Sequence, residues 1–193
     1  MKLLFARNHL TVYPKRSVFL AGPTPPNGSM ENSWRRKVVS RLEAGYNPTS
    51  DVTIVLPEPA TGNWSDILVP NTDEHRESKN DQIAWELQYL DLCNITAFWL
   101  PVYWNSDSSE NFPDNIGPTT RWEFGMMFEK HISNPQKRKL IVGGPDDAQS
   151  VGWAKHVARH HGIEWHTLPK SEKNNLVADS FIEAIANALE DVK

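Results

Sequence analysis

Two glutamates are the residues best suited to do chemistry together. Glu123 lies in the segment Thr-Thr-Arg-Trp-Glu-Phe-Gly, and Glu86 ends the earlier segment Gln-Ile-Ala-Trp-Glu. Cleavage of a glycosidic bond needs two such groups across a cleft: one carboxylate attacks the anomeric carbon, and a second group helps to protonate the leaving group. We therefore treat Glu123 and Glu86 as the candidate catalytic residues.

Each glutamate also has an ordinary structural explanation. Thr120 and Glu123 match a capping box, in which the glutamate satisfies a free N–H group in the first turn of a helix. Glu86 lies about 60° from Ile83 and about 40° from Leu90 on a helical wheel. That position borders the apolar stripe, where a solvated surface glutamate is common. Spacing alone leaves both roles open.

Other charged residues could bind a ligand near this pair. They are the acids Glu58, Asp66, Asp91 and Asp114 and the arginines Arg35, Arg36 and Arg121. Each acid alone is more often a loop or capping residue, and arginines on helix surfaces usually bind nothing so specific as a phosphate. These residues are therefore candidates only through their place in the fold.

No metal or cofactor motif is evident. His156 and His160 share one helix face, but no glutamate follows the first histidine and no third ligand stands at a suggestive spacing. Neither a P-loop nor a Gly-x-Gly-x-x-Gly segment occurs. We therefore predict a site without metal or cofactor.

The elements that must position these residues alternate along the chain. Short apolar or β-branched runs predict strands at residues 17–21, 52–56, 95–100, 139–142 and 164–167. Apolar residues at helical spacing predict helices at about 30–44, 81–93, 121–131, 148–161 and 176–192. Such alternation predicts one α/β domain over residues 1–193, with a five-stranded, mainly parallel sheet and helices on both faces.

The same order predicts where a ligand binds. In doubly wound sheets ligands lie beyond the carboxyl ends of the strands, where the strand order reverses. Here those ends carry Gly22 and Pro23, Pro57 and Glu58, and Gly143. Two long loops, at about 58–79 and 102–119, open onto this edge, and loops of that length are usually functional or mobile.

Composition narrows the class of partner. Twenty basic and 24 acidic side chains give a net charge of -4, which argues against nucleic acid or an anionic membrane, because both need a basic face. A single cysteine excludes an internal disulfide framework, and residues 1–7 are too short an apolar stretch for a signal peptide. No run approaches the ~20 apolar residues of a membrane span. We expect a cytoplasmic protein with a small-molecule ligand, and its eight tryptophans suit a flat heterocycle.

The motifs resemble a known family in their order along residues 17–144. They are Val18-Phe19-Leu20-Ala21-Gly22-Pro23-Thr24, the helix with Trp34-Arg35-Arg36, Leu56-Pro57-Glu58-Pro59 with Trp64, Gln82-Ile83-Ala84-Trp85-Glu86, and Thr120-Arg121-Trp122-Glu123-Phe124-Gly125. This order is similar to that of the nucleoside 2-deoxyribosyltransferase superfamily, and most similar to the subgroup called nucleoside 2-deoxyribosyltransferase-like. The resemblance implies a flavodoxin-like fold.

The resemblance also implies roles for individual residues. The family's nucleophile, a glutamate in a Glu-x-Gly context, falls on Glu123, and its second acid falls on Glu86, eight residues before Asn94. The loop after the first strand, which binds sugar or phosphate in the family, corresponds to Gly22, Pro23 and Thr24. Together with the predicted ligand edge, this gives the expected substrate-binding set: Gly22, Pro23, Thr24, Glu58, Trp64, Asp114, Arg121 and Gly125.

The chain departs from the family pattern at several positions. Asn94 replaces a common aspartate, which we interpret as a structural position, and Glu86 is longer by one methylene than the aspartate of many relatives. Gly117 stands where an acid often precedes the nucleophile by six residues, and Phe19 lacks the aromatic hydroxyl often found there. These departures bear on which substrate is used and on whether the activity is retained.

The expected function is cleavage or transfer at the N-glycosidic bond of a (deoxy)ribonucleoside or nucleotide through a covalent glycosyl–Glu123 intermediate. Resolution by a second base makes a transferase, and resolution by water makes a hydrolase, for instance of a nucleoside monophosphate. The alternative is a non-catalytic nucleotide-binding or sensor domain on the same fold. Relatives often complete their sites across a subunit interface, which implies a homo-oligomer.

Overall fold

The computed structural model describes residues 1–12, 14–23, 33–46, 51–63, 73–100, 118–148 and 151–192. Within these ranges, side chains are described except at residues 73–80, 118 and 173. Thr24, Trp64, Asp66, Asp114 and Gly117 lie outside the described residues.

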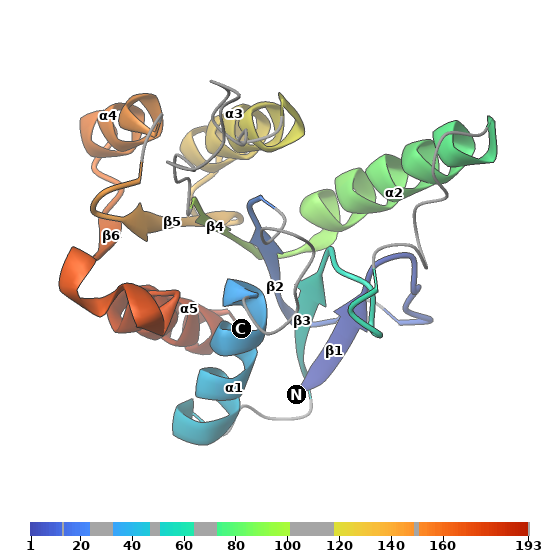
Figure 1. Cartoon of the computed structure of the whole chain (residues 1–193), viewed down its shortest axis with the longest axis horizontal. Helices are drawn as coiled ribbons and strands as arrows, with labels where there is room; N and C mark the ends of the chain where they lie inside the picture. The colour runs from blue at the N-terminus through green and yellow to red at the C-terminus, as the bar shows by residue number, and fades with distance from the viewer. Residues whose placement is uncertain are drawn as a thin grey trace, which may run out of the picture.

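A parallel sheet of six strands forms the centre of the molecule (Figure 1). The strands are β1 (Lys2–Phe5), β2 (Arg16–Ala21), β3 (Val52–Leu56), β4 (Ile95–Trp99), β5 (Lys139–Pro145) and β6 (Trp165–Leu168). Their order in the sheet is β1-β3-β2-β4-β5-β6. Every residue of β3 and β4 is buried, as expected of central parallel strands that are covered on both faces.

The prediction of five strands was one strand short. Residues 2–5 form β1, which pairs in parallel with β3 at the edge of the sheet, with Leu3 opposite Ile54. This stretch has only four residues and no turn signal that separates it as a strand, so its pattern gave no indication. Without β1 the remaining order is that of a flavodoxin-like sheet, 2-1-3-4-5, and the fold prediction is confirmed with one added edge strand.

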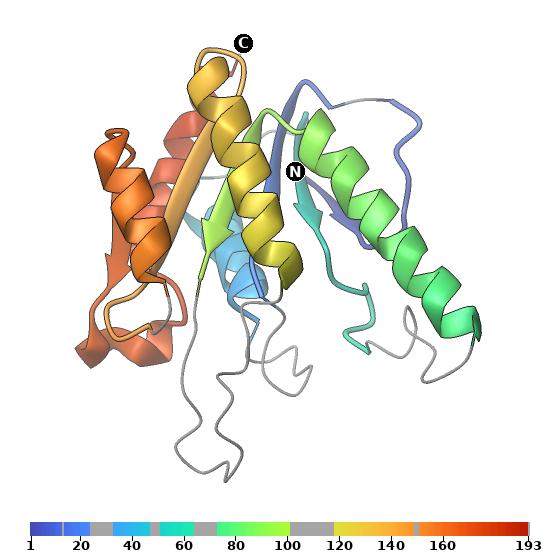
Figure 2. The same ribbon diagram turned by 90° about the horizontal axis from the view of Figure 1, so that it is seen from above.

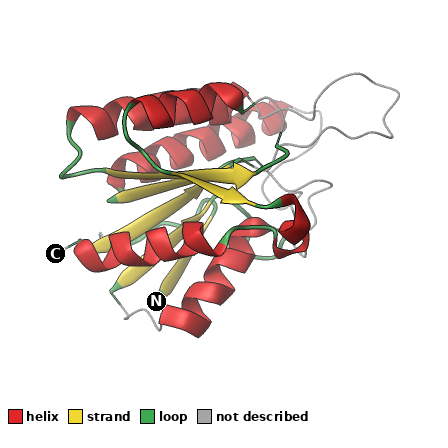
Figure 3. Cartoon of the chain, turned by 90° about the vertical axis from the view of Figure 1, so that its left-hand side faces the viewer, coloured by secondary structure: helices red, strands yellow, loops and turns green. Residues whose placement is uncertain are grey.

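Helices cover both faces of the sheet. They are α1 (Trp34–Tyr46), α2 (Asp73–Leu92), α3 (Pro118–Ser133), α4 (Gly152–His160) and α5 (Asp179–Asp191), with a 3₁₀ helix at Lys170–Asn175. Helices α1 and α5 lie on one face, and α2, α3 and α4 lie on the other (Figures 1 and 3). Among the described residues, no helix is long and apolar enough to cross a bilayer.

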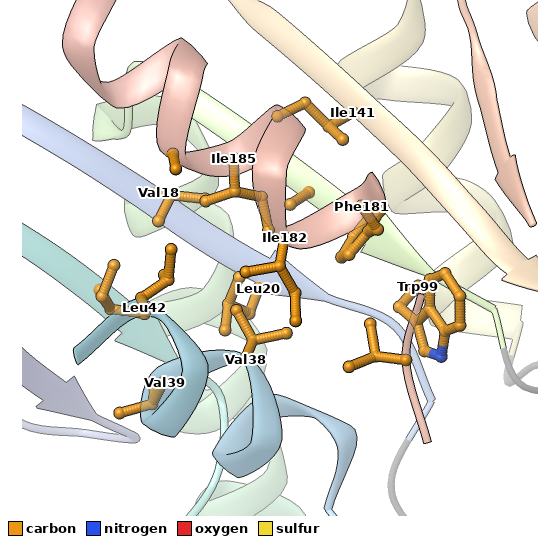
Figure 4. Close-up of a cluster of buried hydrophobic side chains, with 14 of the residues drawn as sticks. Val18, Leu20, Val38, Val39, Leu42, Trp99, Ile141, Phe181, Ile182 and Ile185 are labelled. Atoms are coloured by element: carbon orange, nitrogen blue, oxygen red, sulfur yellow. The ribbon is translucent and has the colours of Figure 1, made fainter. Parts of the chain in front are cut away.

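Two hydrophobic clusters hold the layers together, and strand residues alternate between them. Val18 and Leu20 pack toward α1 and α5, as Figure 4 shows, whereas Phe19 and Ala21 pack toward α2, α3 and α4. This period of two is the geometry of a strand. Each fully buried apolar side chain stabilises the fold by about 1.5–3 kcal/mol, so the clusters fix both helical layers against one rigid sheet.

Two helices begin earlier than predicted. Helix α2 begins at Asp73 rather than at residue 81, and α3 begins at Pro118 rather than at residue 121. The first two turns of α2 read Asp-Glu-His-Arg-Glu-Ser-Lys-Asn, a wholly polar segment in which apolar periodicity gives no signal. The start of α3 has a direct consequence for Glu123, because it moves this residue from the first turn into the second.

Candidate active site

The topology places a switch point between β2 and β4. The chain leaves β2 toward β3 on one side, and later β4 pairs with β2 on the other side. The carboxyl ends of β2 and β4 therefore bound the crevice in which ligands bind in this class of sheet. Helices α2 and α3, which carry the two candidate glutamates, lie on the same face of the sheet (Figure 2).

Glu86 and Glu123 meet in the structure and are hydrogen-bonded to each other. Glu123 is buried, with 5% of its surface exposed, and Glu86 is half-buried. Gln82, one turn before Glu86 on α2, donates an amide hydrogen bond of 2.8 Å to the Oε1 of Glu86. Residues that are 37 positions apart in the sequence thus form one polar cluster.

The electrostatics of the pair favour a protonated carboxyl. Burial, and after it the neighbouring charge and hydrogen bond of Glu86, together raise the pKa of Glu123 to about 8, while the charge of Arg35 opposes that rise. Burial also raises the pKa of Glu86, while the hydrogen bonds from Gln82 and Glu123 and the charge of Arg35 oppose that rise. Near neutral pH Glu123 is therefore largely protonated and lies beside a second carboxyl group, an arrangement that can combine an acid with a carboxylate.

The capping-box interpretation of Glu123 is wrong. Because α3 begins at Pro118, Glu123 is the sixth residue of the helix and lies beyond the first-turn N–H groups that such a box satisfies. Packing of the next residue fixes its direction instead: Phe124 contacts Phe98 of β4 edge to face, with ring centroids 5.3 Å apart. The corresponding neighbour of Glu86, Trp85, packs on Phe19 of β2 at 6.2 Å.

Arg35 anchors the end of β2, a role that was not predicted from the sequence. Its guanidinium donates to the carbonyl oxygens of Leu20 at 2.8 Å, Gly22 at 2.5 Å and Pro23 at 3.3 Å. The side chain is 2% exposed, and its charge acts on both Glu86 and Glu123. Burial lowers the pKa of Arg35, and Glu58 and the two candidate glutamates oppose that change.

A signal for Arg35 was present in the sequence. Arg35, Val38, Val39 and Leu42 are spaced i, i+3, i+4 and i+7, so the arginine lies on the apolar face of α1 rather than on its surface. A charged residue on that face must find a buried partner. This spacing predicts a buried guanidinium, although not the groups that it binds.

Gly22 has a structural requirement of its own. Its φ of +143° is a conformation that residues with a Cβ rarely adopt. A Cβ at this position would also clash with the carbonyl oxygen of Trp99, at the end of β4. The glycine therefore lets the ends of β2 and β4 approach closely at the switch point, and together with Pro23 it lies at the predicted edge.

Glu58 is fully buried in a cluster of complementary charge. Its carboxylate accepts hydrogen bonds from the Ser33 hydroxyl at 2.5 and 3.1 Å. The Nη1 of Arg35 lies 3.6 Å from one of its oxygens, and the Nε of Arg36 lies 3.8 Å from the other. In this structure Glu58 faces these three side chains rather than solvent, and through Arg35 it supports the end of β2.

The remaining candidates are exposed to solvent or lie outside the described residues. Arg121 is exposed at the start of α3, beside Trp122, which is 55% exposed. Gly125 is exposed, and no described atom lies within 4 Å of the Cβ that it lacks, so the close approach expected there is not found among the described residues. Thr24, Trp64 and Asp114, also expected to bind substrate, belong to the undescribed ranges.

Two other positions have clear structural settings. The side-chain oxygen of Asn94 accepts hydrogen bonds from the backbone N–H and the hydroxyl of Ser17, at 3.1 and 3.0 Å, and so ties the start of β4 to β2, as a structural residue would. His156 and His160 are exposed on α4. Within the described ranges, no three metal-binding side chains gather into a possible site.

Comparison with known proteins identifies a family. No curated protein matches the chain. The sequence model of a family described as nucleoside 2-deoxyribosyltransferase like matches residues 15–135, which is more than half of the 193 residues. The matched segment includes β2, β3, β4 and both helices that carry the paired glutamates. The chain therefore belongs to the nucleoside 2-deoxyribosyltransferase-like family.

Proposed function

We propose that this protein cleaves the N-glycosidic bond of a (deoxy)ribonucleoside or nucleotide through a covalent glycosyl–Glu123 intermediate. The observation that carries the proposal is the buried, hydrogen-bonded pair of carboxyl groups on α2 and α3. Such a pair supplies both a nucleophile and a proton at the same place, which is what departure of a nucleobase requires. Membership of the family supports a nucleoside as the substrate class.

The first chemical step follows from the protonation state of the pair. The bond between the anomeric carbon and the base nitrogen breaks, and its electron pair stays on the nitrogen. The single proton of the pair moves to the leaving base, and an oxygen of Glu123 bonds to the anomeric carbon. Glu86 assists by passing or holding this proton. Arg35 stabilises the negative charge that remains on the pair.

The second step decides between transfer and hydrolysis. Attack on the glycosyl–Glu123 ester by a free base restores the carboxylate and forms a new nucleoside. Attack by water releases the sugar instead, so exclusion of water from the intermediate favours the transferase. The family name supports transfer.

The test compares wild type with Glu123→Gln, and with Glu129→Gln, an exposed glutamate on the same helix, as the matched control. Each protein is incubated with nucleosides and nucleoside monophosphates, with and without a free acceptor base, and the products are separated by chromatography. We expect Glu123→Gln to lose at least about 10³-fold in turnover, because an amide is no carboxylate nucleophile. The control should retain wild-type turnover.

Two results would contradict the proposal. Wild-type turnover by Glu123→Gln would remove the glutamate from the mechanism. Absence of turnover by the wild type on the whole panel, combined with binding of the same ligands in calorimetry, would favour a nucleotide-binding module. Dependence of product on the added base separates the transferase from the hydrolase.

A further inference from the structure

We propose that Gln82 is a positioning residue that keeps the proton of the carboxyl pair on Glu123 and leaves Glu86 ionised. The placement of the proton is a property of the free protein, and its consequence for turnover rests on the proposed function. The inference gives a role to a buried polar side chain that does not itself take part in the chemistry.

The first argument is the hydrogen bond itself. Gln82 and Glu86 are four residues apart on α2, so they share one face of the helix. The amide Nε2 of Gln82 donates to the Oε1 of Glu86 at 2.8 Å, and Gln82 is only 6% exposed. An N–H donor stabilises a carboxylate more than a neutral carboxyl, and more so where water is excluded. This contact therefore favours an ionised Glu86.

The second argument is the difference in surroundings between the two acids. Glu123 is 5% exposed and Glu86 is half-buried, so ionisation costs more at Glu123. Among the described residues, the groups that act on the pair are Gln82 from α2, Arg35 from α1 and the two glutamates themselves. The charge of Arg35 acts on both acids, whereas Gln82 donates to only one of them. Gln82 is thus the neighbour that distinguishes them.

The third argument is an acceptor that has no partner. The Oε1 of Gln82 is buried and makes no hydrogen bond with the described residues. If the amide group of Gln82 rotated by about 180°, this oxygen would face Glu86 and could accept a hydrogen bond from the protonated form of Glu86. In the resting protein the amide nitrogen pairs with the Glu86 carboxylate, and its oxygen would pair with Glu86 only during turnover, while Glu86 carries the proton.

These points give the proton a route. In the resting protein the proton lies on Glu123. When a nucleoside binds, the proton passes to Glu86 and from there to the leaving base nitrogen, while Glu123 becomes the carboxylate that bonds to the anomeric carbon. One proton and one electron pair move in each step, and no other reactant is needed.

The test measures ionisation directly. Protein labelled with ¹³C at the glutamate carboxyl carbon is titrated by NMR, and the two signals are assigned through Glu86→Gln and Glu123→Gln. We expect Glu86 to ionise at lower pH than Glu123 in the wild type. Gln82→Met, which keeps length but removes the donor, should raise the midpoint of Glu86 by about one pH unit, a tenfold change in its ionisation constant.

Gln88→Met is the matched control, because Gln88 is exposed on the same helix; it should leave both midpoints unchanged. If Gln82→Met does not fold, Gln82→Asn, whose shorter side chain draws the donor away from Glu86, gives the same comparison. In turnover assays, Gln82→Met should shift the acid limb of the pH–rate profile to higher pH. A merely structural role of Gln82 would instead lower the rate at every pH.

Two outcomes would overturn the inference. Either Glu86 ionises above Glu123 in the wild type, or its midpoint is the same in Gln82→Met and Gln88→Met. Neither outcome depends on a substrate. A protein that cleaves no nucleoside but shows the expected titration would therefore refute the proposed function and retain the role of Gln82. A protein that cleaves nucleosides but shows either of these two outcomes would retain the proposed function and refute the role of Gln82.

Discussion

Two buried carboxylate sites lie at the same end of the sheet and differ in how their charge is balanced. Glu58 is met by two guanidinium groups and a hydroxyl. Glu86 and Glu123 instead contact each other, and Arg35, whose charge acts on both, is also engaged with Glu58 and three backbone carbonyls. A balanced buried charge holds a scaffold in place. An unbalanced pair keeps a proton at neutral pH, which is a property of functional sites.

Arg35 joins the two sites, so they are not independent. Its guanidinium lies 3.6 Å from Glu58, binds the end of β2, and stabilises the ionised forms of the paired glutamates. The scaffold site therefore determines where the positive charge of the second site stands. Substitutions that remove charge from each site test whether the contrast holds.

The largest effect on stability is expected at the balanced site. Glu58→Gln removes the counter-charge of two guanidinium groups, of which Arg35 is fully buried, and should lower the free energy of unfolding by about 3–5 kcal/mol. Denaturant unfolding measures this loss, with Glu43→Gln, an exposed glutamate on α1, as the control. A loss below about 1 kcal/mol would mean that charge balance does not hold this cluster together.

At the pair of Glu86 and Glu123, removal of a charge should stabilise the protein at high pH rather than destabilise it. The pKa of Glu123 is raised to about 8 in the folded protein, against about 4.3 in an unfolded chain. Its contribution to stability is therefore fully present below the unfolded value and is lost as the pH rises through 8. Glu123→Gln, a neutral isostere, should flatten this dependence and exceed the wild type at pH 9 by about 2–4 kcal/mol.

Unfolding curves of the wild type and Glu123→Gln between pH 5.5 and 9 measure the effect. Near pH 5.5 the difference between the two proteins should shrink to roughly a third of its value at pH 9, because that pH is only about one unit above the pKa of an unfolded glutamate. Parallel curves over the whole range would show that Glu123 carries no raised pKa. That result would remove the difference in charge balance between the Glu58 site and the pair of Glu86 and Glu123.

The smallest effect on stability is expected for an ion pair on the protein surface. Arg41 of α1 and Asp179 of α5 are 2.5 Å apart, and their side chains are 48% and 63% exposed. Arg41→Gln should lower stability by less than about 1 kcal/mol, and added salt should remove most of that difference. Thermal unfolding at low and high ionic strength measures it. A loss as large as that of Glu58→Gln would mean that burial is not what separates the sites.

Much of the fold was predictable because its signals are local. Residues 52–56 and 139–142 are short β-branched or apolar runs that end at proline or glycine, and both are strands in the structure. Alternation of such runs with helices predicted the parallel sheet. Glu86 and Glu123 were predicted from motif resemblance, and the structure brings their side chains together.

The parts that could not be predicted depend on partners that are distant in the sequence. The pairing of β1 with β3 joins residues about fifty positions apart. Glu58 was expected to bind substrate, but nothing local to it shows that Ser33 and two arginines surround its carboxylate. A polar start such as that of α2 forms a helix without an apolar stripe, so its periodicity carries no information.

The aromatic residues next to the two acids pack on the sheet, and this packing fixes the distance between the acids. Trp85 and Phe124, each adjacent to one glutamate, rest on Phe19 of β2 and Phe98 of β4. These two strands are hydrogen-bonded neighbours, whose spacing of about 4.8 Å is set by backbone geometry. The spacing of these two strands thus sets the separation of the acids, although each acid is carried by a separate helix.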